Sequence, residues 1–195
     1  GMPLERGGCR EDDGRPAGNE DRGEVGGAAL DDRDQLLEGV ATIELARPDN
    51  GNRLTAPEVA ELGRTIRATG GRRDVKVAVL RAQGDAFCLG RIPGDGPQPK
   101  TALEIRTQVA DPILSFYADI RATEVPVIAL PQGPALGFGT AAVGVCDLAI
   151  AADDAQFGLS EINWGIVPGG NVTRAVVQTM RHRDAMYYIM TGNPF

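Results

Sequence analysis

The sequence has little of several residue types on which common functional sites depend. Its 195 residues include a single histidine, His182, and three cysteines. One histidine argues against a histidine-based metal site and against a serine–histidine–aspartate triad. The cysteines Cys9, Cys88 and Cys146 are odd in number and far apart, which favours reduced thiols and predicts a cytoplasmic protein.

Long apolar runs and an excess of positive charge are also absent. The sequence contains no run of about 18 apolar residues, so a membrane-spanning helix is not expected. The first residues lack the apolar centre of a secretory signal. The formal net charge is −7, which argues against nucleic acid as the main partner. We therefore expect neither a membrane nor a nucleic acid as a partner.

Most of the negative charge lies in residues 1–38. This segment carries eleven acidic side chains and five arginines, and its glycine-rich part up to Ala28 has almost no branched or aromatic residues. Such a composition buries too little apolar area to offset the entropy lost on ordering. We predict a disordered acidic tail over 1–38, either an interaction tail or a solvated leader, and one folded domain over 39–195.

The folded part alternates between strand and helix patterns. Pro112 predicts a break or kink within the second helix, and Thr55 with Glu58 predicts a capped start for the first. Strands are expected at residues 40–46, 75–80, 125–130 and 147–152, and the first is broken by Pro48, Asn50, Gly51 and Asn52. Helices are expected at residues 55–70, 102–120, 140–145, 171–181 and 183–191. The first is expected to have a buried stripe of Val59, Leu62 and Ile66. The second has apolar residues at helical spacing, namely Leu103, Ile105, Val109, Ile113, Leu114, Tyr117 and Ile120. This alternation predicts the α/β class.

Two glycine-rich loops each follow a strand and precede a helix. The first spans residues 84–96 and the second residues 133–139. Backbone N–H groups at a helix N-terminus favour negative charge. Two such groups from separate loops, if they converge, would form an oxyanion hole for an enolate or a tetrahedral oxyanion.

The second loop also fits a dinucleotide-binding pattern. Residues 137–142 read G-x-G-x-x-A, and Asp153 and Asp154 follow the next strand, where a ribose-binding acid would lie. Five residues, 132–136, separate the preceding strand from Gly137, whereas the fingerprint requires a tight turn. A nucleotide-binding Rossmann domain is therefore the weaker alternative.

Five segments resemble the crotonase superfamily of enoyl-CoA hydratases and isomerases, in family order and with similar spacing. They are residues 87–90, 125–129, 133–139, 146–151 and 157–162. The resemblance covers about residues 39–195 and implies a spiral of ββα units that assembles as a homotrimer or hexamer. It implies an acyl-CoA thioester as substrate, with no metal and no further cofactor. Because family members continue into a C-terminal helical part, that part is expected to be cut short at Phe195.

The resemblance also assigns roles to residues of the two loops. The oxyanion-hole donors would be the backbone N–H groups of Arg91 and Phe138. Phe138 stands where the family has a glycine, and a phenylalanine tolerates a positive φ poorly. The residues expected to line the thioester site are Cys88, Leu89, Gly90, Gly137 and Trp164.

The acid–base residue implied by the resemblance is Glu161. Hydratases of the family use two glutamates, and the position of the first is occupied here by Ala141. A carboxylate beside Ile162 and Trp164 in a closed pocket would have a raised pKa, suited to moving one proton. Trp164 itself is either part of an aryl pocket or part of the core.

Residues 159–165, 182–183 and 187–192 are similar to one branch of the superfamily, the hydroxycinnamoyl-CoA hydratase-lyases. That branch also keeps only the second glutamate. The similarity implies water addition to a conjugated enoyl-CoA, and cleavage to an aldehyde and acetyl-CoA. The main alternative is a non-catalytic acyl-CoA-binding protein with the same fold, which Phe138, Ala141 and the early end of the chain favour.

Overall fold

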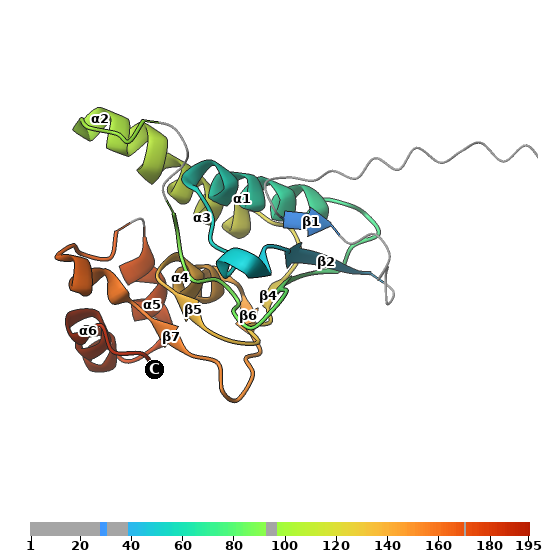
Figure 1. Cartoon of the computed structure of the whole chain (residues 1–195). Helices are drawn as coiled ribbons and strands as arrows, with labels where there is room; N and C mark the ends of the chain where they lie inside the picture. The colour runs from blue at the N-terminus through green and yellow to red at the C-terminus, as the bar shows by residue number, and fades with distance from the viewer. Residues whose placement is uncertain (1–27, 31–38, 93–96, 170) are drawn as a thin grey trace, which may run out of the picture.

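A computed structural model of the chain contains a mostly parallel sheet with helices packed against it (Figure 1). The structure describes residues 28–30, 39–92, 97–169 and 171–195. The strand order is β1-β2-β3-β4-β6, with β1 antiparallel to β2 and the other pairs parallel. The strands are β1 (Ala28–Leu30), β2 (Val40–Leu45), β3 (Val77–Ala82), β4 (Val127–Ala129) and β6 (Leu148–Ala149). The predicted α/β class is confirmed.

A second, smaller sheet joins two segments that are far apart in the sequence. Strand β5 (Ala135–Leu136) pairs in parallel with β7 (Phe157–Gly158). Because β5 lies outside the main sheet, the segment before Gly137 is not the strand-to-helix turn of a Rossmann unit. Phe157 and Phe195 exchange backbone hydrogen bonds of 2.8 Å, which attach residue 195 to β7.

Helix α1 (Ala56–Gly70) begins at the predicted cap. The backbone N–H and the hydroxyl of Thr55 donate to Glu58 Oε2 at 2.7 and 2.8 Å. The predicted buried stripe is confirmed, since Val59, Leu62 and Ile66 are at most 1% exposed. The short 3₁₀ helix η1 (Pro48–Asn50) precedes α1.

The predicted helix 102–120 is one helical segment with a π-helical centre. It comprises α2 (Ala102–Ile105), η2 (Arg106–Ala110) and α3 (Asp111–Arg121). Pro112 has no N–H to continue the regular ladder, and the Asp111 N–H bonds to Arg106 O, five residues back. Pro112 is therefore accommodated by a π turn in place of a break.

The apolar stripe predicted for this segment needs a correction. Leu103 and Ile105 are exposed because α2 projects from the body of the protein (Figure 1). Phe116, which the stripe omitted, is fully buried together with Tyr117. Helices α1 and α3 pack so closely that a Cβ on Gly63 would lie 2.8 Å from the Phe116 Cα.

The N-terminal prediction also changes in one place. Residues 28–30, which the composition assigned to the tail, form strand β1, and Ala28 pairs with Leu45. The backbone N–H and C=O groups on the edge of β2 can pair with a further strand, and this possibility cannot be predicted from the composition of residues 28–30. The rest of the predicted tail lies outside the described residues.

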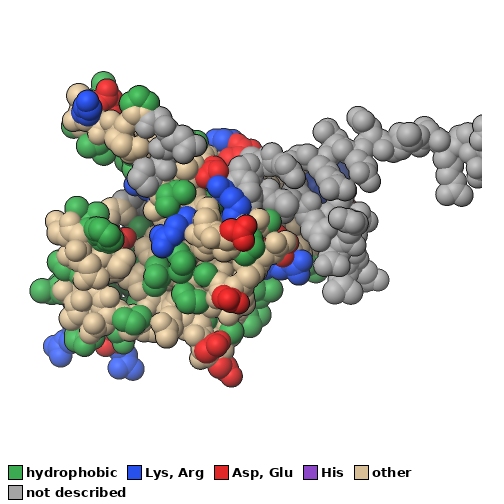
Figure 2. All heavy atoms as spheres, viewed as in Figure 1, with side chains coloured by type: hydrophobic (Ala, Val, Ile, Leu, Met, Phe, Trp, Pro, Cys, Tyr) green, Lys and Arg blue, Asp and Glu red, His purple; other side chains and the backbone are tan. Residues whose placement is uncertain are grey.

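The second half of the chain is mainly helical and carries more exposed apolar side chains. Its helices are α4 (Phe138–Val145), η3 (Ser160–Trp164), α5 (Val172–Thr179) and α6 (His182–Thr191). Figure 2 shows hydrophobic side chains scattered over the visible face. The exposed ones from this half include Leu148, Ile150, Trp164, Ile166, Val167 and Met190. Among the described residues, no helix is both long and apolar enough to cross a bilayer.

Candidate active site

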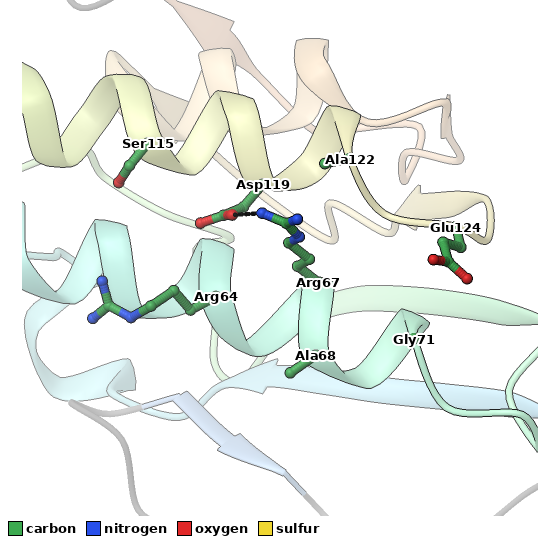
Figure 3. A pocket seen from close by; sticks show the side chains of 8 residues that line it. All are labelled: Arg64, Arg67, Ala68, Gly71, Ser115, Asp119, Ala122 and Glu124. Atoms are coloured by element: carbon green, nitrogen blue, oxygen red, sulfur yellow. Dashed lines mark hydrogen bonds and ion pairs between the residues drawn. The ribbon is translucent and has the colours of Figure 1, made fainter.

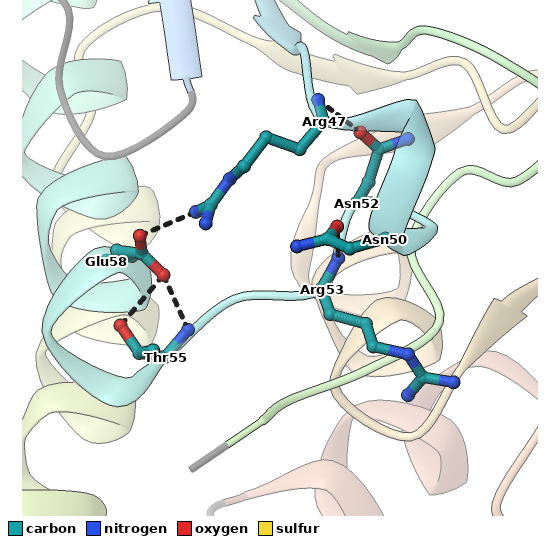
Figure 4. Close-up of polar contacts among 6 residues, drawn as sticks. All are labelled: Arg47, Asn50, Asn52, Arg53, Thr55 and Glu58. Carbon is teal, nitrogen blue, oxygen red and sulfur yellow. Dashed lines mark hydrogen bonds and ion pairs between the residues drawn. The ribbon is translucent and has the colours of Figure 1, made fainter. Parts of the chain in front are cut away.

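A buried asparagine holds the beginning of the first glycine loop. Asn52 is 1% exposed and has a φ of 55°. Its side-chain amide donates to the carbonyls of Gln83 and Ala86 at 2.8 Å each, and its Oδ1 accepts from the Arg47 N–H at 2.9 Å. Figure 4 shows Asn52 below Arg47, with the side chain of Arg47 extending to Glu58. Asn52 therefore links two loops that flank the site.

The two glycine loops lie side by side, as the resemblance predicted. The Leu136 N–H donates to Cys88 O at 2.9 Å, and Cys88 forms a parallel bridge with Ala135. A Cβ built on Gly139 would lie only 2.1 Å from Cys88 O. Only glycine at this position allows the first loop to approach the start of α4 so closely.

The backbone of the first loop leaves the Arg91 N–H on its open side. Leu54 donates to Gly90 O at 3.2 Å and accepts from the Ile92 N–H at 2.9 Å. In a parallel bridge of this kind the residue between the two bonded ones directs its own N–H away from the partner strand. Gly90 has a φ of 99°, and a Cβ there would lie 3.1 Å from Leu136 O. The Arg91 N–H thus leaves the loop on the side away from Leu54, next to the second loop.

Phe138 provides the other candidate donor, at the start of α4. A positive φ at Phe138 would be unfavourable, but the positive φ belongs to Gly137, at 53°, and Phe138 is the first helical residue. Its N–H has no acceptor within the helix, as is usual for the first turn. The side chain is 5% exposed and packs edge-to-face on Phe116, with the ring centroids 5.2 Å apart. The core therefore accommodates the phenylalanine side chain that replaces the glycine of the family.

Glu161 lies against the second loop. The side chain comes from η3, and a Cβ built on Gly137 would be 3.4 Å from Glu161 Oε1. Glu161 Oε2 is buried and has no hydrogen-bond partner among the described residues. Burial raises the pKa of Glu161, because the charged form loses hydration. A half-buried carboxylate that favours its proton therefore stands beside Gly137 and the Phe138 N–H.

The expected apolar cover over Glu161 is wrong. Ile162 is 43% exposed and Trp164 is 78% exposed, so neither closes a pocket around the carboxylate within this chain. Trp164 is not a core residue either. The carboxylate faces Gly137 and also acts electrostatically on Tyr117 of α3.

Thr140 supports the second loop, and the sequence pattern did not single it out. Its hydroxyl oxygen lies 2.6 Å from Ala135 O and 2.9 Å from Gly158 O, and it accepts from the Gly158 N–H at 3.1 Å. This buried hydroxyl ties α4 to both strands of the small sheet. Ala141, one residue later, is fully buried and supplies no carboxylate.

The remaining residues predicted for the thioester site have structural contacts. Cys88 is 1% exposed, and burial raises the pKa of its thiol to about 11, so it is a packed residue and a poor nucleophile. Leu89 holds the loop through its backbone. Its N–H donates to Gly51 O at 2.9 Å, and its carbonyl accepts from the Arg53 guanidinium at 2.6 Å.

A surface groove between α1 and α3 is separate from these loops (Figure 3). Its volume is about 590 Å³, and its lining includes Arg64, Arg67, Ser115 and Asp119. Arg67 points across the groove to Asp119 at 3.1 Å. None of the residues predicted for the thioester site lines it, and both of its arginines are already paired, Arg64 with Glu61 and Arg67 with Asp119.

Comparison with known proteins identifies relatives of the chain. Residues 35–195 match the family model described as enoyl-CoA hydratase/isomerase. The chain is 34% identical, over 83% of its length, to a hydroxycinnamoyl-CoA hydratase-lyase of Pseudomonas fluorescens, and covers 59% of that protein. It is 33% identical, over 78% of its length, to an (E)-benzylidenesuccinyl-CoA hydratase of Thauera aromatica, and again covers 59%.

Solved structures show the same likeness in three dimensions. An enoyl-CoA hydratase of Bacillus anthracis superposes with a TM-score of 0.76 at 26% identity, covering 87% of this chain and 64% of that one. An enoyl-CoA hydratase of Mycobacterium smegmatis superposes with a TM-score of 0.75 at 28% identity, covering 83% of this chain and 62% of that one. The chain thus spans about three fifths of the length of these relatives. The predicted crotonase-like fold is confirmed, and the chain belongs to the enoyl-CoA hydratase/isomerase family.

Proposed function

We propose that this chain binds an acyl-CoA thioester and adds water to the conjugated double bond of its acyl group. The observation that carries the proposal is the position of Glu161, whose Oε2 is buried without a partner in the described part of the chain. Its other oxygen is close to Gly137, next to the first backbone N–H of α4, which has no acceptor within the helix. A buried carboxylate beside an oxyanion site is suited to proton transfer at a carbon next to a thioester carbonyl.

In the proposed reaction, the thioester oxygen accepts hydrogen bonds from the Arg91 and Phe138 N–H groups. Water attacks the β-carbon, Glu161 takes one proton of that water, and the electron pair moves to the thioester oxygen as an enolate. Glu161 then returns the proton to the α-carbon. One carboxylate suffices for this sequence, because it acts first as base and then as acid. Two backbone donors would stabilise the enolate by several kcal/mol, at about 3 kcal/mol each.

An aromatic acyl group is the substrate class that the relatives favour. Both the hydroxycinnamoyl-CoA hydratase-lyase and the benzylidenesuccinyl-CoA hydratase are named for aryl substrates. With such a substrate, a 3-hydroxyacyl product could undergo retro-aldol cleavage to an aldehyde and acetyl-CoA. We extend the proposal to that second, lyase step and to a place in aromatic or fatty acid metabolism.

The assembly and location follow the same proposal. A homo-oligomer is supported by the exposed apolar side chains of the second half of the chain, such as Ile150 and Val167. A cytoplasmic location is supported by the free thiols of Cys88 and Cys146.

The test is turnover of aryl and alkyl enoyl-CoA thioesters, followed by the loss of absorbance of the conjugated double bond. Glu161→Gln should lower kcat by about 100-fold or more, because the amide cannot exchange a proton. Asp154→Asn, which neutralises an exposed acid elsewhere, is the matched control and should leave kcat unchanged. Full turnover by Glu161→Gln would refute the role of this carboxylate.

A non-catalytic acyl-CoA-binding protein is the second candidate, and Ala141 favours it. The position where two-glutamate hydratases carry their first carboxylate is here a fully buried alanine. Calorimetric titration with enoyl-CoA distinguishes the two functions. Tight binding with no hydration of any enoyl-CoA by the wild-type chain would favour the binding protein.

A further inference from the structure

A buried tyrosine outside the two glycine loops has a hydroxyl that makes no hydrogen bond with the described residues. Tyr117, on α3, is 3% exposed. Its ring packs edge-to-face on Phe116 at 5.6 Å, and Phe116 packs in the same way on Phe138 at 5.2 Å. A continuous set of rings therefore connects Tyr117 with the first residue of α4.

The hydroxyl of Tyr117 and the carboxylate of Glu161 share one property. In the described residues, Tyr117 Oη and Glu161 Oε2 are both buried and make no hydrogen bond. Buried polar atoms are rarely left unpaired in native proteins, and those that are often serve a ligand or a water. Two such oxygens, from α3 and η3, are thus unpaired in the described part of the chain, and the Glu161 carboxylate lies beside Gly137, directly before α4.

The electrostatics agree with this pairing. Burial raises the pKa of Tyr117, and the negative charge of Glu161 raises it further, so the two groups are close enough to interact. With a raised pKa, the Tyr117 hydroxyl keeps its proton at neutral pH. It can form hydrogen bonds with a bound molecule but is not a base.

The chemistry of hydration requires a second polar group near Glu161. A water molecule that gives one proton to a carboxylate needs another hydrogen-bond partner to direct its lone pair at the β-carbon. Ala141, being apolar, does not supply one. We propose that the Tyr117 hydroxyl is this second group and that it binds the attacking water and the 3-hydroxyl which that water becomes.

The proposed step balances without a change in Tyr117. One O–H bond of the water breaks and its proton goes to Glu161, while the water oxygen forms the new bond to the β-carbon. The other O–H of the water donates a hydrogen bond to Tyr117 Oη. Tyr117 keeps its own proton throughout, so it is a positioning group for the water. This inference rests on the proposed hydration, but it also predicts a binding preference that needs no turnover.

The test measures affinity with Tyr117→Phe, which removes one oxygen atom and retains the ring. Binding of a 3-hydroxyacyl-CoA and of the saturated acyl-CoA of equal length is compared by calorimetry, in a Glu161→Gln background so that the ligand is not converted. Tyr117→Phe should weaken the binding of the 3-hydroxyacyl-CoA by about fivefold, which corresponds to the loss of one neutral hydrogen bond. The affinity for the saturated ester should stay unchanged. The control, Tyr187→Phe, removes an exposed hydroxyl that contacts Asn193 and should change neither.

Two further measurements separate a positioning role from a packing role. In the chain with Glu161 intact, Tyr117→Phe should lower kcat by about tenfold or more with little change in KM. The melting temperature should stay the same or rise, because the variant removes an unpaired buried hydroxyl. A lower melting temperature together with equal losses for both ligands would show that Tyr117 only packs, and would overturn the inference.

The outcomes also separate this inference from the proposed function. If the wild-type chain prefers the 3-hydroxyacyl-CoA, and Tyr117→Phe loses that preference without any enoyl-CoA being hydrated, Tyr117 binds the 3-hydroxyl as inferred, while the hydratase proposal and the attacking water fail. If hydration occurs and Tyr117→Phe keeps full kcat and ligand preference, the inference alone fails. A chain that binds neither thioester overturns both.

Discussion

The two halves of this molecule bury their apolar side chains to very different degrees. Around the sheet, residues such as Ile43, Leu80 and Phe116 are completely buried. From η3 onward, Trp164 is 78% and Val167 80% exposed. The part of the chain before η3 therefore supplies most of the shared core, whereas the part from η3 onward presents large apolar side chains at the surface.

The candidate active site lies across the boundary between these halves. Both backbone donors depend on interlocked loops, where Gly139 touches Cys88 O and Thr140 bonds to both strands of the small sheet. Glu161 instead belongs to a single 3₁₀ turn whose neighbouring side chains are exposed. The difference indicates that the oxyanion side is held rigidly by the fold, while the carboxylate side depends on fewer contacts.

The largest effect is expected for Gly139→Ala in the interlocked half. Alanine normally stabilises a helix relative to glycine, but here its Cβ would meet Cys88 O at 2.1 Å. The backbone of one loop must move, which should cost about 3 kcal/mol of unfolding free energy and separate the two donors. Urea unfolding measures the cost. A stabilised variant would mean that the loops do not approach as described.

Asn52→Ala should have the next largest effect. The substitution leaves the buried carbonyls of Gln83 and Ala86 and the N–H of Arg47 without their partner. Its cost should be about 2–3 kcal/mol of unfolding free energy, with a fall in kcat because the first loop loses its anchor. Exposed Asn193 gives a comparison, since Asn193→Ala should cost less than about 0.5 kcal/mol.

Gly165→Ala tests the weakly packed half and should cost less. Gly165 has a φ of 69°, but a Cβ there would meet nothing within 4 Å. Only the backbone strain remains, about 1 kcal/mol. If Gly165→Ala were as damaging as Gly139→Ala, the contrast between the two halves would be wrong. Thermal and urea unfolding of both variants, measured side by side, make the comparison.

The smallest effect concerns stability as a function of pH. Because burial raises the pKa of Glu161 above its ordinary value of 4.5, the folded state binds this proton more tightly than the unfolded state. The folded protein therefore loses stability as the pH rises from about 4.5 through the raised pKa. The Glu161→Gln variant stays neutral, so its melting temperature should be higher than that of the wild type at pH 7. Near pH 4 the two melting temperatures should be equal. An equal melting temperature at pH 7 would show that the carboxylate is hydrated in the folded chain.

Local sequence patterns predicted the elements well where packing and capping are regular. The Thr55–Glu58 cap and the stripe of Val59, Leu62 and Ile66 are as expected, because they depend on residues one helical turn apart. The stripe of the segment 102–121 was partly wrong. Its first turns project away from the body, so Leu103 stays exposed although its spacing suits a buried position.

The site was predicted in part by resemblance and in part not at all. The ordered motifs placed Glu161 and the two loops together, and the folded chain brings Glu161 within contact of Gly137. Asn52 was read only as a residue that breaks a strand, since asparagine is common in turns. Tyr117 was read as one more apolar position on a helix, and nothing in the spacing indicates that its hydroxyl is unpaired.

By itself, the sequence determined the class of fold, the order along the chain of strands β2, β3, β4 and β6 and of the main helices, and the two glycine loops, because these follow from short-range periodicity and from residues without side chains. Only the tertiary structure decided which glycine carries the positive φ beside Phe138 and which polar groups are buried without partners. Those features arise where segments far apart in the chain exclude water from one another. Desolvation and unpaired hydrogen-bonding groups depend on that exclusion, which no local pattern encodes.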